Sequence, residues 1–261
     1  MAEYKTYSIE CKYKRLIIVT DIHNCHKEWH AETEKRMERL CEALNAEYQR
    51  APYDAILMLG DYSLDFWGWE IGGSYLWEKP VSYTEDFVRR FVPRLPAEVY
   101  MIPGNHEQYS EADFIRITGY PREYSIVYGE SVFAMLDTFA GGLDPKENSD
   151  GVYTGINGEF LAELLKAHPE KRMIICAHDI SPKRESEAVR ELICVEKRIV
   201  CAFTGHTHRD NTLLLPDSFR NLPVFYCGDF SYNGGRSREK NWGYRLLDIT
   251  DGLISTEYVR V

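Results

Sequence analysis

Short runs of apolar residues recur along the chain, and five of them end directly in a polar cluster. The runs cover residues 16–19, 55–59, 99–102, 173–177 and 199–203. Each is continuous and rich in β-branched residues, which is typical of strands that are buried on both faces. The pattern therefore predicts a core of buried strands, each of which delivers polar residues at its carboxyl end.

Between these runs, apolar residues recur every three or four positions, as on the buried face of an amphipathic helix. This spacing predicts a helix over residues 29–48. We expect Thr84 to cap a second helix, because acidic residues follow it in the first turn. We expect Asn157 to cap a third helix, which Pro169 ends, and the pattern favours a fourth over residues 185–192.

The C-terminal third is rich in strand patterns. Residues 224–227, 244–249 and 254–261 are expected to be strands, with Asp251 and Gly252 in a hairpin turn between the last two. The sequence contains no internal repeat, low-complexity segment or long linker. We therefore expect residues 1–261 to form one α/β domain, in which two mixed β-sheets pack as a sandwich with helices outside.

Composition narrows the class of protein. The formal net charge of −10 gives no overall attraction to nucleic acid or to an anionic membrane surface. The seven cysteines are odd in number and include no C-x-x-C pair, which argues against a disulfide framework and against a thiolate zinc site. The sequence shows no secretory signal and no apolar stretch of about 20 residues. We expect a soluble cytoplasmic protein with no membrane partner and no nucleic-acid polymer as substrate.

The polar clusters that end the five strands supply a mixture of carboxylate, amide and imidazole groups. Their residues are Asp21, His23, Asp61, Asn105, His106, His178, His206 and His208. Ligands bind at the carboxyl ends of strands in open α/β sheets, so we expect the clusters to meet at one sheet edge. Residues two apart in extended backbone point to the same side, which would bring Asp21 and His23 together, and likewise His206 and His208.

This donor chemistry predicts a metal site. Oxygen and imidazole ligands without thiolate suit manganese, iron or zinc better than calcium or magnesium. Taken without His106, the clusters offer two carboxylates, one amide oxygen and four imidazoles. These seven side chains exceed what one open tetrahedral zinc site uses. They are about right for two divalent ions that share one carboxylate and act together on a phosphoryl group.

The motifs D-x-H, G-D, G-N-H-E, a lone H and G-H-T-H, in this order, resemble those of the calcineurin-like metallophosphoesterase superfamily. They span Asp21 to His208. The resemblance implies a four-layer sandwich and the following assignment of ligands: Asp21, His23 and His208 to one metal, Asp61 to both, and Asn105, His178 and His206 to the second.

The resemblance also implies a reaction. His106 would be the catalytic histidine that stabilises the transition state or protonates the leaving oxygen, and a metal-bridging hydroxide would attack a phosphodiester or phosphomonoester. The expected substrate is a small phosphoester, such as a nucleotide, and manganese is the ion that we expect to support activity in vitro. The alternative is a non-catalytic scaffold with the same fold. One departure from the family pattern lies three residues after Asp61, where members often carry an acid: here that position is Leu64, and Asp65 follows.

Four further residues are candidates for contact with the substrate because they lie next to motifs or in a glycine-bearing loop: Asn24, Tyr62, Arg209 and Arg236. The aromatic segment 66–77 could stack on a planar group. Packing of a long loop onto the domain explains its composition equally well.

Overall fold

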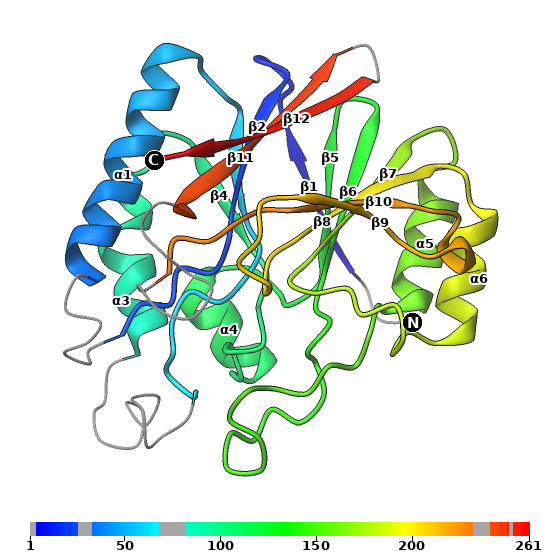
Figure 1. The fold of residues 1–261 in the computed structure, drawn as a ribbon, viewed down its shortest axis with the longest axis horizontal. Helices are drawn as coiled ribbons and strands as arrows, with labels where there is room; N and C mark the ends of the chain where they lie inside the picture. Colours follow the sequence, from blue (N-terminus) through cyan, green and yellow to red (C-terminus); the bar gives the residue numbers. More distant parts are fainter. Residues whose placement is uncertain (1–3, 26–32, 68–81, 232–240, 251–252) are drawn as a thin grey trace.

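The computed structural model describes residues 4–25, 33–67, 82–231, 241–250 and 253–261. Two mixed β-sheets face each other (Figure 1). The five-stranded sheet has the order β12 (Leu253–Arg260), β11 (Gly243–Thr250), β2 (Arg15–Val19), β3 (Ala55–Met58) and β4 (Glu98–Met101). The seven-stranded sheet has the order β1 (Lys5–Ile9), β5 (Tyr124–Tyr128), β6 (Ser131–Leu136), β7 (Arg172–Ala177), β8 (Ile199–Thr204), β10 (Pro223–Tyr226) and β9 (Thr212–Leu214).

The strands that precede the motifs run parallel within each sheet. In the five-stranded sheet β2 pairs with β3 and β3 with β4, both parallel, whereas β11 is antiparallel to β2 and to β12. In the seven-stranded sheet β6, β7, β8 and β10 are parallel neighbours. Parallel pairing places the carboxyl ends of these strands at one end of each sheet.

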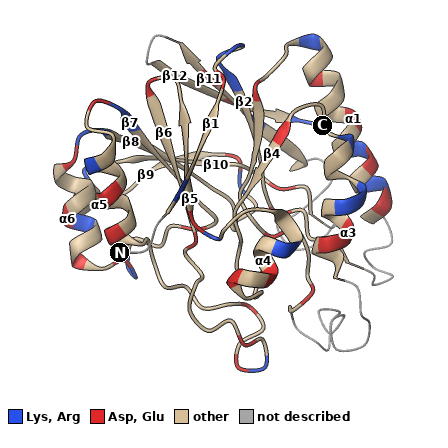
Figure 2. Cartoon of the chain, turned by 180° about the vertical axis from the view of Figure 1, so that it is seen from behind, with Lys and Arg blue, Asp and Glu red and all other residues tan. Residues whose placement is uncertain are grey.

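Helices cover the outer face of both sheets. Helices α1 (Thr33–Arg50), α3 (Tyr83–Arg90) and α4 (Glu111–Thr118) contribute buried side chains to the core on the five-stranded sheet. Helices α5 (Gly158–Ala167) and α6 (Glu187–Val195) do the same on the seven-stranded sheet. Short 3-10 helices span Val92–Arg94 and Asp217–Phe219. Charged side chains lie along the helices, whereas the strands between them are largely uncharged (Figure 2).

A third apolar cluster fills the space between the sheets. It includes Ile18, Leu57, Phe133, Ile174 and Phe203, all of them fully buried. The order helices, sheet, sheet, helices confirms the expected four-layer α/β sandwich. None of the described helices is long and apolar enough to cross a membrane, and all seven cysteines are free.

Most of the expected elements are present, with one correction at a helix start. The hydroxyl of Ser82 accepts a hydrogen bond from the Glu85 amide and caps α3, whereas Thr84 lies inside that helix, so the prediction of Thr84 as the cap was wrong. Asn157 caps α5 as predicted. The expected turn at residues 251–252 and the first residues of the helix expected from residue 29 lie outside the described residues.

Candidate metal centre

The polar clusters come from both sheets, not from one. Asp21, Asp61 and Asn105 follow β2, β3 and β4 of the five-stranded sheet, while His178 and His206 follow β7 and β8 of the seven-stranded sheet. The expectation of one shared sheet edge was therefore wrong. The two sheets lie face to face, and the carboxyl ends of their parallel strands meet across the sandwich.

The backbone at most of these positions is left-handed rather than extended. Positive φ angles occur at five of the seven predicted ligands: Asp21, His23, Asp61, His206 and His208. Only a small share of non-glycine residues adopts this conformation, and it is concentrated at functional sites. Asp21 and His23 therefore converge in one donor group through a tight turn, and Ile22 between them is fully buried. His206 and His208 do not converge on each other: His206 joins the group of Asp61 and His178, whereas His208 joins that of Asp21 and His23.

Glycines next to the ligands make room for the carboxylates. A Cβ on Gly104 would lie 2.2 Å from Oδ1 of Asp61, and a Cβ on Gly205 would lie 2.5 Å from Oδ2 of Asp21. Both distances are shorter than real Cβ contacts. In the G-N-H-E and G-H-T-H motifs, the glycine is thus required by the close approach of a carboxylate from another motif.

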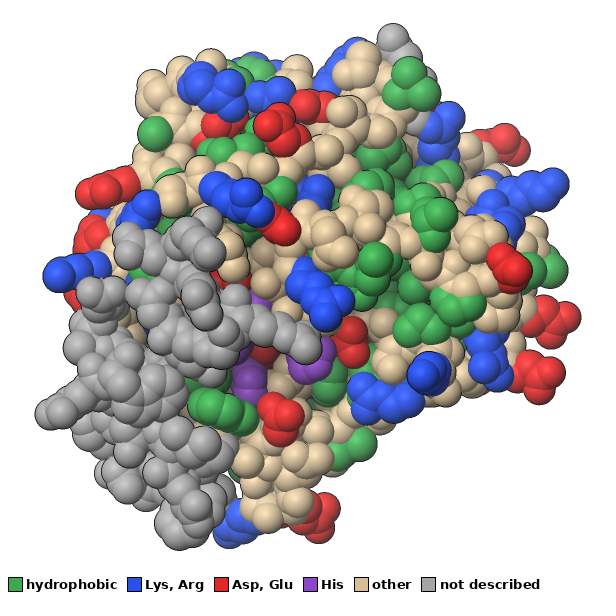
Figure 3. All heavy atoms as spheres, viewed as in Figure 1, with side chains coloured by type: hydrophobic (Ala, Val, Ile, Leu, Met, Phe, Trp, Pro, Cys, Tyr) green, Lys and Arg blue, Asp and Glu red, His purple; other side chains and the backbone are tan. Residues whose placement is uncertain are grey.

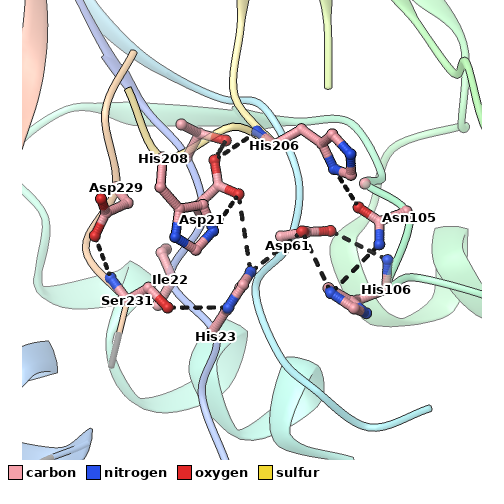
Figure 4. A network of polar contacts seen from close by, with 12 residues as sticks. Asp21, Ile22, His23, Asp61, Asn105, His106, His206, His208, Asp229 and Ser231 are labelled. Carbon is pink, nitrogen blue, oxygen red and sulfur yellow. Dashed lines mark hydrogen bonds and ion pairs between the residues drawn. The ribbon is translucent and has the colours of Figure 1, made fainter. Parts of the chain in front are cut away.

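The donor atoms form three overlapping groups, each compact enough to surround an ion (Figure 4). The groups are Asp21 with His23 and His208, His23 with Asp61 and His106, and Asp61 with His178 and His206. Nε2 of His178 lies 3.0 Å and Nε2 of His23 lies 3.2 Å from Oδ2 of Asp61. Nε2 of His208 lies 3.2 Å from Oδ1 of Asp21.

Asn105 completes the site although it is not a charged group. Its Oδ1 lies 3.0 Å from Nε2 of His178 and 2.9 Å from Nδ1 of His206. Oδ1 of Asp21 is buried and accepts no hydrogen bond. A buried carboxylate oxygen without a hydrogen bond, with the Nε2 atoms of His208 and His23 at 3.2 Å and 3.8 Å, fits a divalent cation. The structure therefore brings together all seven predicted ligands around space that suits metal ions.

The buried carboxylates and imidazoles of the cluster strongly shift one another's pKa values. Burial alone would lower the pKa of His178, but the adjacent Asp61 carboxylate raises that pKa to about 10. Burial lowers the pKa of His23 to about 4. Burial would raise the pKa of Asp61, but the imidazolium of His178 and neighbouring histidines hold it well below its usual range. Without metal, protons on some imidazoles balance the carboxylates.

Metal binding should therefore release protons. With a pKa of about 10, His178 is protonated in the metal-free protein at pH 7.5, and a cation can use its nitrogen only after that proton leaves. We expect release of about one proton or more per protein, and a metal affinity that rises with pH up to about 10. Titration calorimetry in buffers of different ionisation enthalpy measures this number. Binding heats that do not change with the buffer would contradict the prediction.

Two charged residues outside the predicted ligands fix the ligand loops. The buried carboxylate of Glu107 accepts hydrogen bonds from the amides of Asp61, Tyr62 and Gly104. The buried guanidinium of Arg36 donates to the carbonyls of Ile22, His23 and Phe230, beneath the first motif. Glu107 belongs to the G-N-H-E motif, so the sequence contained a signal for it, whereas nothing nearby in the sequence pointed to Arg36.

The first motif is also supported by a residue that follows a strand of the seven-stranded sheet. The hydroxyl of Ser231, a few residues after β10, lies 2.9 Å from Nδ1 of His23. Its own backbone amide donates to Asp229. This contact leaves Nε2 of His23 directed at Asp61 (Figure 4). Ser231 was not among the predicted site residues.

Asp150 fixes the orientation of Asn105. The amide nitrogen of Asn105 donates to the backbone oxygen of Asp150 at 3.2 Å and to its Oδ1 at 3.0 Å. The amide oxygen is thereby directed at His178 and His206. Asp150 lies in the long connection between β6 and α5, far in sequence from every motif, and sequence reasoning missed it.

Replacing Asp150 by alanine should weaken metal binding. The amide of Asn105 would lose the carboxylate acceptor and keep only the backbone oxygen of residue 150. Loss of such a supporting contact costs about 10- to 100-fold in metal affinity. Asp150→Asn keeps an acceptor oxygen and should lose less. Competition with a chromophoric chelator measures both variants. An Asp150→Ala variant with the affinity of the wild type would show that Asn105 needs no such support.

The four residues predicted to contact the substrate differ in their position relative to the site. Tyr62 is fully buried, and its hydroxyl donates to the carbonyls of Met58 and Ile102, so the structure does not bring it to the site. The Asn24 side chain is also buried and donates to the Tyr83 carbonyl. Arg209 is exposed directly after His208. Arg236 lies outside the described residues.

His106 and part of the aromatic segment lie at the site. Nε2 of His106 is 3.7 Å from Oδ2 of Asp61. The ring of Trp67 is 5.8 Å from the ring of His106, edge to face, whereas Phe66 packs on Tyr109 in the core. Residues 68–77 of this segment lie outside the described residues.

Comparisons with known proteins agree with this architecture. The family model of calcineurin-like phosphoesterases matches residues 14–210, and the chain belongs to that family. Among solved structures, the chain is similar to GAP50, the anchor in the inner membrane complex of Plasmodium, with a TM-score of 0.53 and 13% identity over 94% of this chain and 84% of that one. At this identity the likeness shows the fold alone. A search of curated proteins finds no match.

Proposed function

We propose that this protein is a metal-dependent hydrolase of small phosphoesters. The observation that carries the proposal is the convergence of two carboxylates, one amide and four imidazoles from both sheets, with His106 beside them. Two divalent ions at such a site would neutralise phosphoryl charge and make water a nucleophile at neutral pH. Asp21, His23 and His208 would hold one ion, and Asn105, His178 and His206 the other, with Asp61 serving both.

The remaining residues of the site would orient the reaction. Burial lowers the pKa of His106, against the opposing effect of Asp61, which favours a neutral imidazole that carries one N–H. Such an N–H can donate to a phosphoryl oxygen or to the leaving oxygen. Glu107 accepts hydrogen bonds from the amides of Asp61 and Gly104. These bonds would hold the Asp61 carboxylate in place while negative charge develops on the phosphoryl group.

An activity assay tests the proposal. Protein loaded with manganese, iron or zinc should hydrolyse p-nitrophenyl phosphate or bis-p-nitrophenyl phosphate, and a chelator should abolish the activity. We expect manganese to support activity in vitro. Failure to hydrolyse a broad panel of phosphoesters, with metal content verified, would exclude the hydrolase.

The second candidate function is a non-catalytic scaffold. It is favoured by the fold that the chain shares with GAP50, whose name describes an anchor. Intact donors at every motif favour the hydrolase, because a scaffold has no need of buried, mutually repelling carboxylates. Metal analysis distinguishes the two, since a scaffold without catalysis predicts no metal retained after purification in metal-containing buffer.

A further inference from the structure

Two side chains that are not among the predicted ligands, Trp67 and Asp150, lie against His106. Trp67 presents its ring to the imidazole, with centroids 5.8 Å apart, and is itself partly exposed. Asp150 lies with Oδ1 3.8 Å from Nε2 of His106. Histidine side chains reach the surface on this face of the molecule, with both acidic and basic side chains close to them (Figure 3).

Both side chains are carried by anchored backbone. The Trp67 amide donates to the Leu64 carbonyl, and the preceding Phe66 is packed in the core. Asp150 is held by the two hydrogen bonds from Asn105. The next residue, Gly151, packs so closely on Asn105 that a Cβ there would lie 2.6 Å from its carbonyl oxygen. The position of each group relative to His106 is therefore fixed by the fold.

The exposure of Asp150 distinguishes it from the predicted metal ligands. Its side chain is 63% exposed, whereas that of Asp61 is 2% exposed. Oδ1 of Asp150 accepts a hydrogen bond from the Asn105 amide. The side chain is otherwise exposed, so its negative charge faces solvent. If His106 donates to the leaving oxygen, the group attached to that oxygen lies near both a carboxylate and an indole, because each of them contacts His106.

We propose that the leaving group of the natural substrate carries a positive charge, as an amine or a quaternary ammonium on a short alcohol does. This inference rests on the proposed function and on the role of His106 within it. A carboxylate beside an aromatic face is a recognised arrangement for binding organic cations. An anionic leaving group, such as a further phosphate, would be repelled by Asp150 at close range.

A matched pair of substrates isolates the charge. Choline phosphate and 3,3-dimethylbutyl phosphate have the same shape, but only the first carries a cation. The proposed function includes both phosphomonoesters and phosphodiesters, so the methyl diesters of the two compounds are measured as well. Proton NMR follows the release of the alcohol. The metal-loaded wild type should prefer the cationic member by about 3- to 30-fold in kcat/KM, the range that cation–aromatic contacts give.

Two variants locate the preference. Asp150→Asn keeps an acceptor for Asn105 and removes the charge, so it should bring the ratio of the two kcat/KM values close to one. Trp67→Leu removes the aromatic face and should lower the same ratio. Because each ratio is taken within one variant, a general loss of activity or of metal cancels from it.

The outcomes separate the two proposals. A wild-type ratio below about two, or hydrolysis of p-nitrophenyl esters without hydrolysis of either matched substrate, overturns the cationic leaving group and leaves the hydrolase intact. A preference that Asp150→Asn and Trp67→Leu both leave unchanged overturns the assignment to these residues. Absence of hydrolysis for every ester, p-nitrophenyl esters included, overturns both proposals.

Discussion

Replacing His106 by alanine should lower kcat by about 100- to 10,000-fold while the protein keeps its metal, because a proton donor next to the reacting oxygen contributes a factor of this size. His106 is buried, and its Nε2 lies 3.7 Å from Oδ2 of Asp61. It therefore lies beside the seven predicted ligands and takes the place of none of them. Steady-state kinetics combined with elemental analysis of the same sample measures both quantities.

The matched control is His168→Ala. His168 follows α5 and belongs to no motif, so both turnover and metal content should stay at the wild-type level. His106 also belongs to one of the compact donor groups, with His23 and Asp61. Loss of metal together with activity in His106→Ala would therefore assign His106 as a ligand rather than as a proton donor.

Replacing Asp61 by asparagine should remove most bound metal and, with it, the activity. Oδ2 of Asp61 lies close to Nε2 of both His23 and His178. Within the described part of the chain, Asp61 is the only carboxylate that belongs to two of the three donor groups. Since supporting contacts alone are worth about 10- to 100-fold in affinity, loss of the shared ligand should cost at least about 100-fold. Elemental analysis after dialysis, and chelator competition, measure the change.

Asp65→Asn is the appropriate control, because Asp65 is also buried and lies only four residues away. Its carboxylate accepts hydrogen bonds from the amides of Tyr83 and Thr84 at the start of α3 and from the Tyr109 hydroxyl, and none of these belongs to the metal site. This variant should lower the thermal midpoint and retain metal. Equal metal loss in both variants would mean that Asp61→Asn acts through general destabilisation.

The motif strands were predictable because they are buried on both faces and therefore apolar without interruption. Strand β1 was missed because it is an edge strand whose residues are largely exposed, so its sequence KTYSI has no such run. Helix α4 was missed because its apolar residues are mixed with polar ones in a short segment. Strand β6 was missed although its sequence SVFAML contains a continuous buried apolar run, and its hairpin partner β5 (YSIVY) was missed with it. The capping error at Thr84 has a local cause, since Ser82 offers a hydroxyl of the same kind two residues earlier.

The candidate ligands were predictable as residue types at strand ends, but their arrangement was not. Sequence reasoning placed Asp21 and His23 on extended backbone, whereas both adopt left-handed turns. The contribution of Asp150 could not be inferred, because it depends on how the connection after β6 folds back onto Asn105. Contacts of this kind are set by tertiary packing and leave no periodic signal in the chain.

Because the site is divided between two sheets, a bound metal would also stabilise the fold. Asp21 and His23 belong to one sheet and His208 to the other, and Asp61 is likewise separated from His178 and His206. An ion shared across that boundary joins the sheets at the open end of the sandwich, where the interior is polar rather than apolar. The melting temperature should therefore rise with free metal concentration, as for any ligand that binds only the folded state. Thermal denaturation thus provides a gauge of site occupancy that needs no substrate.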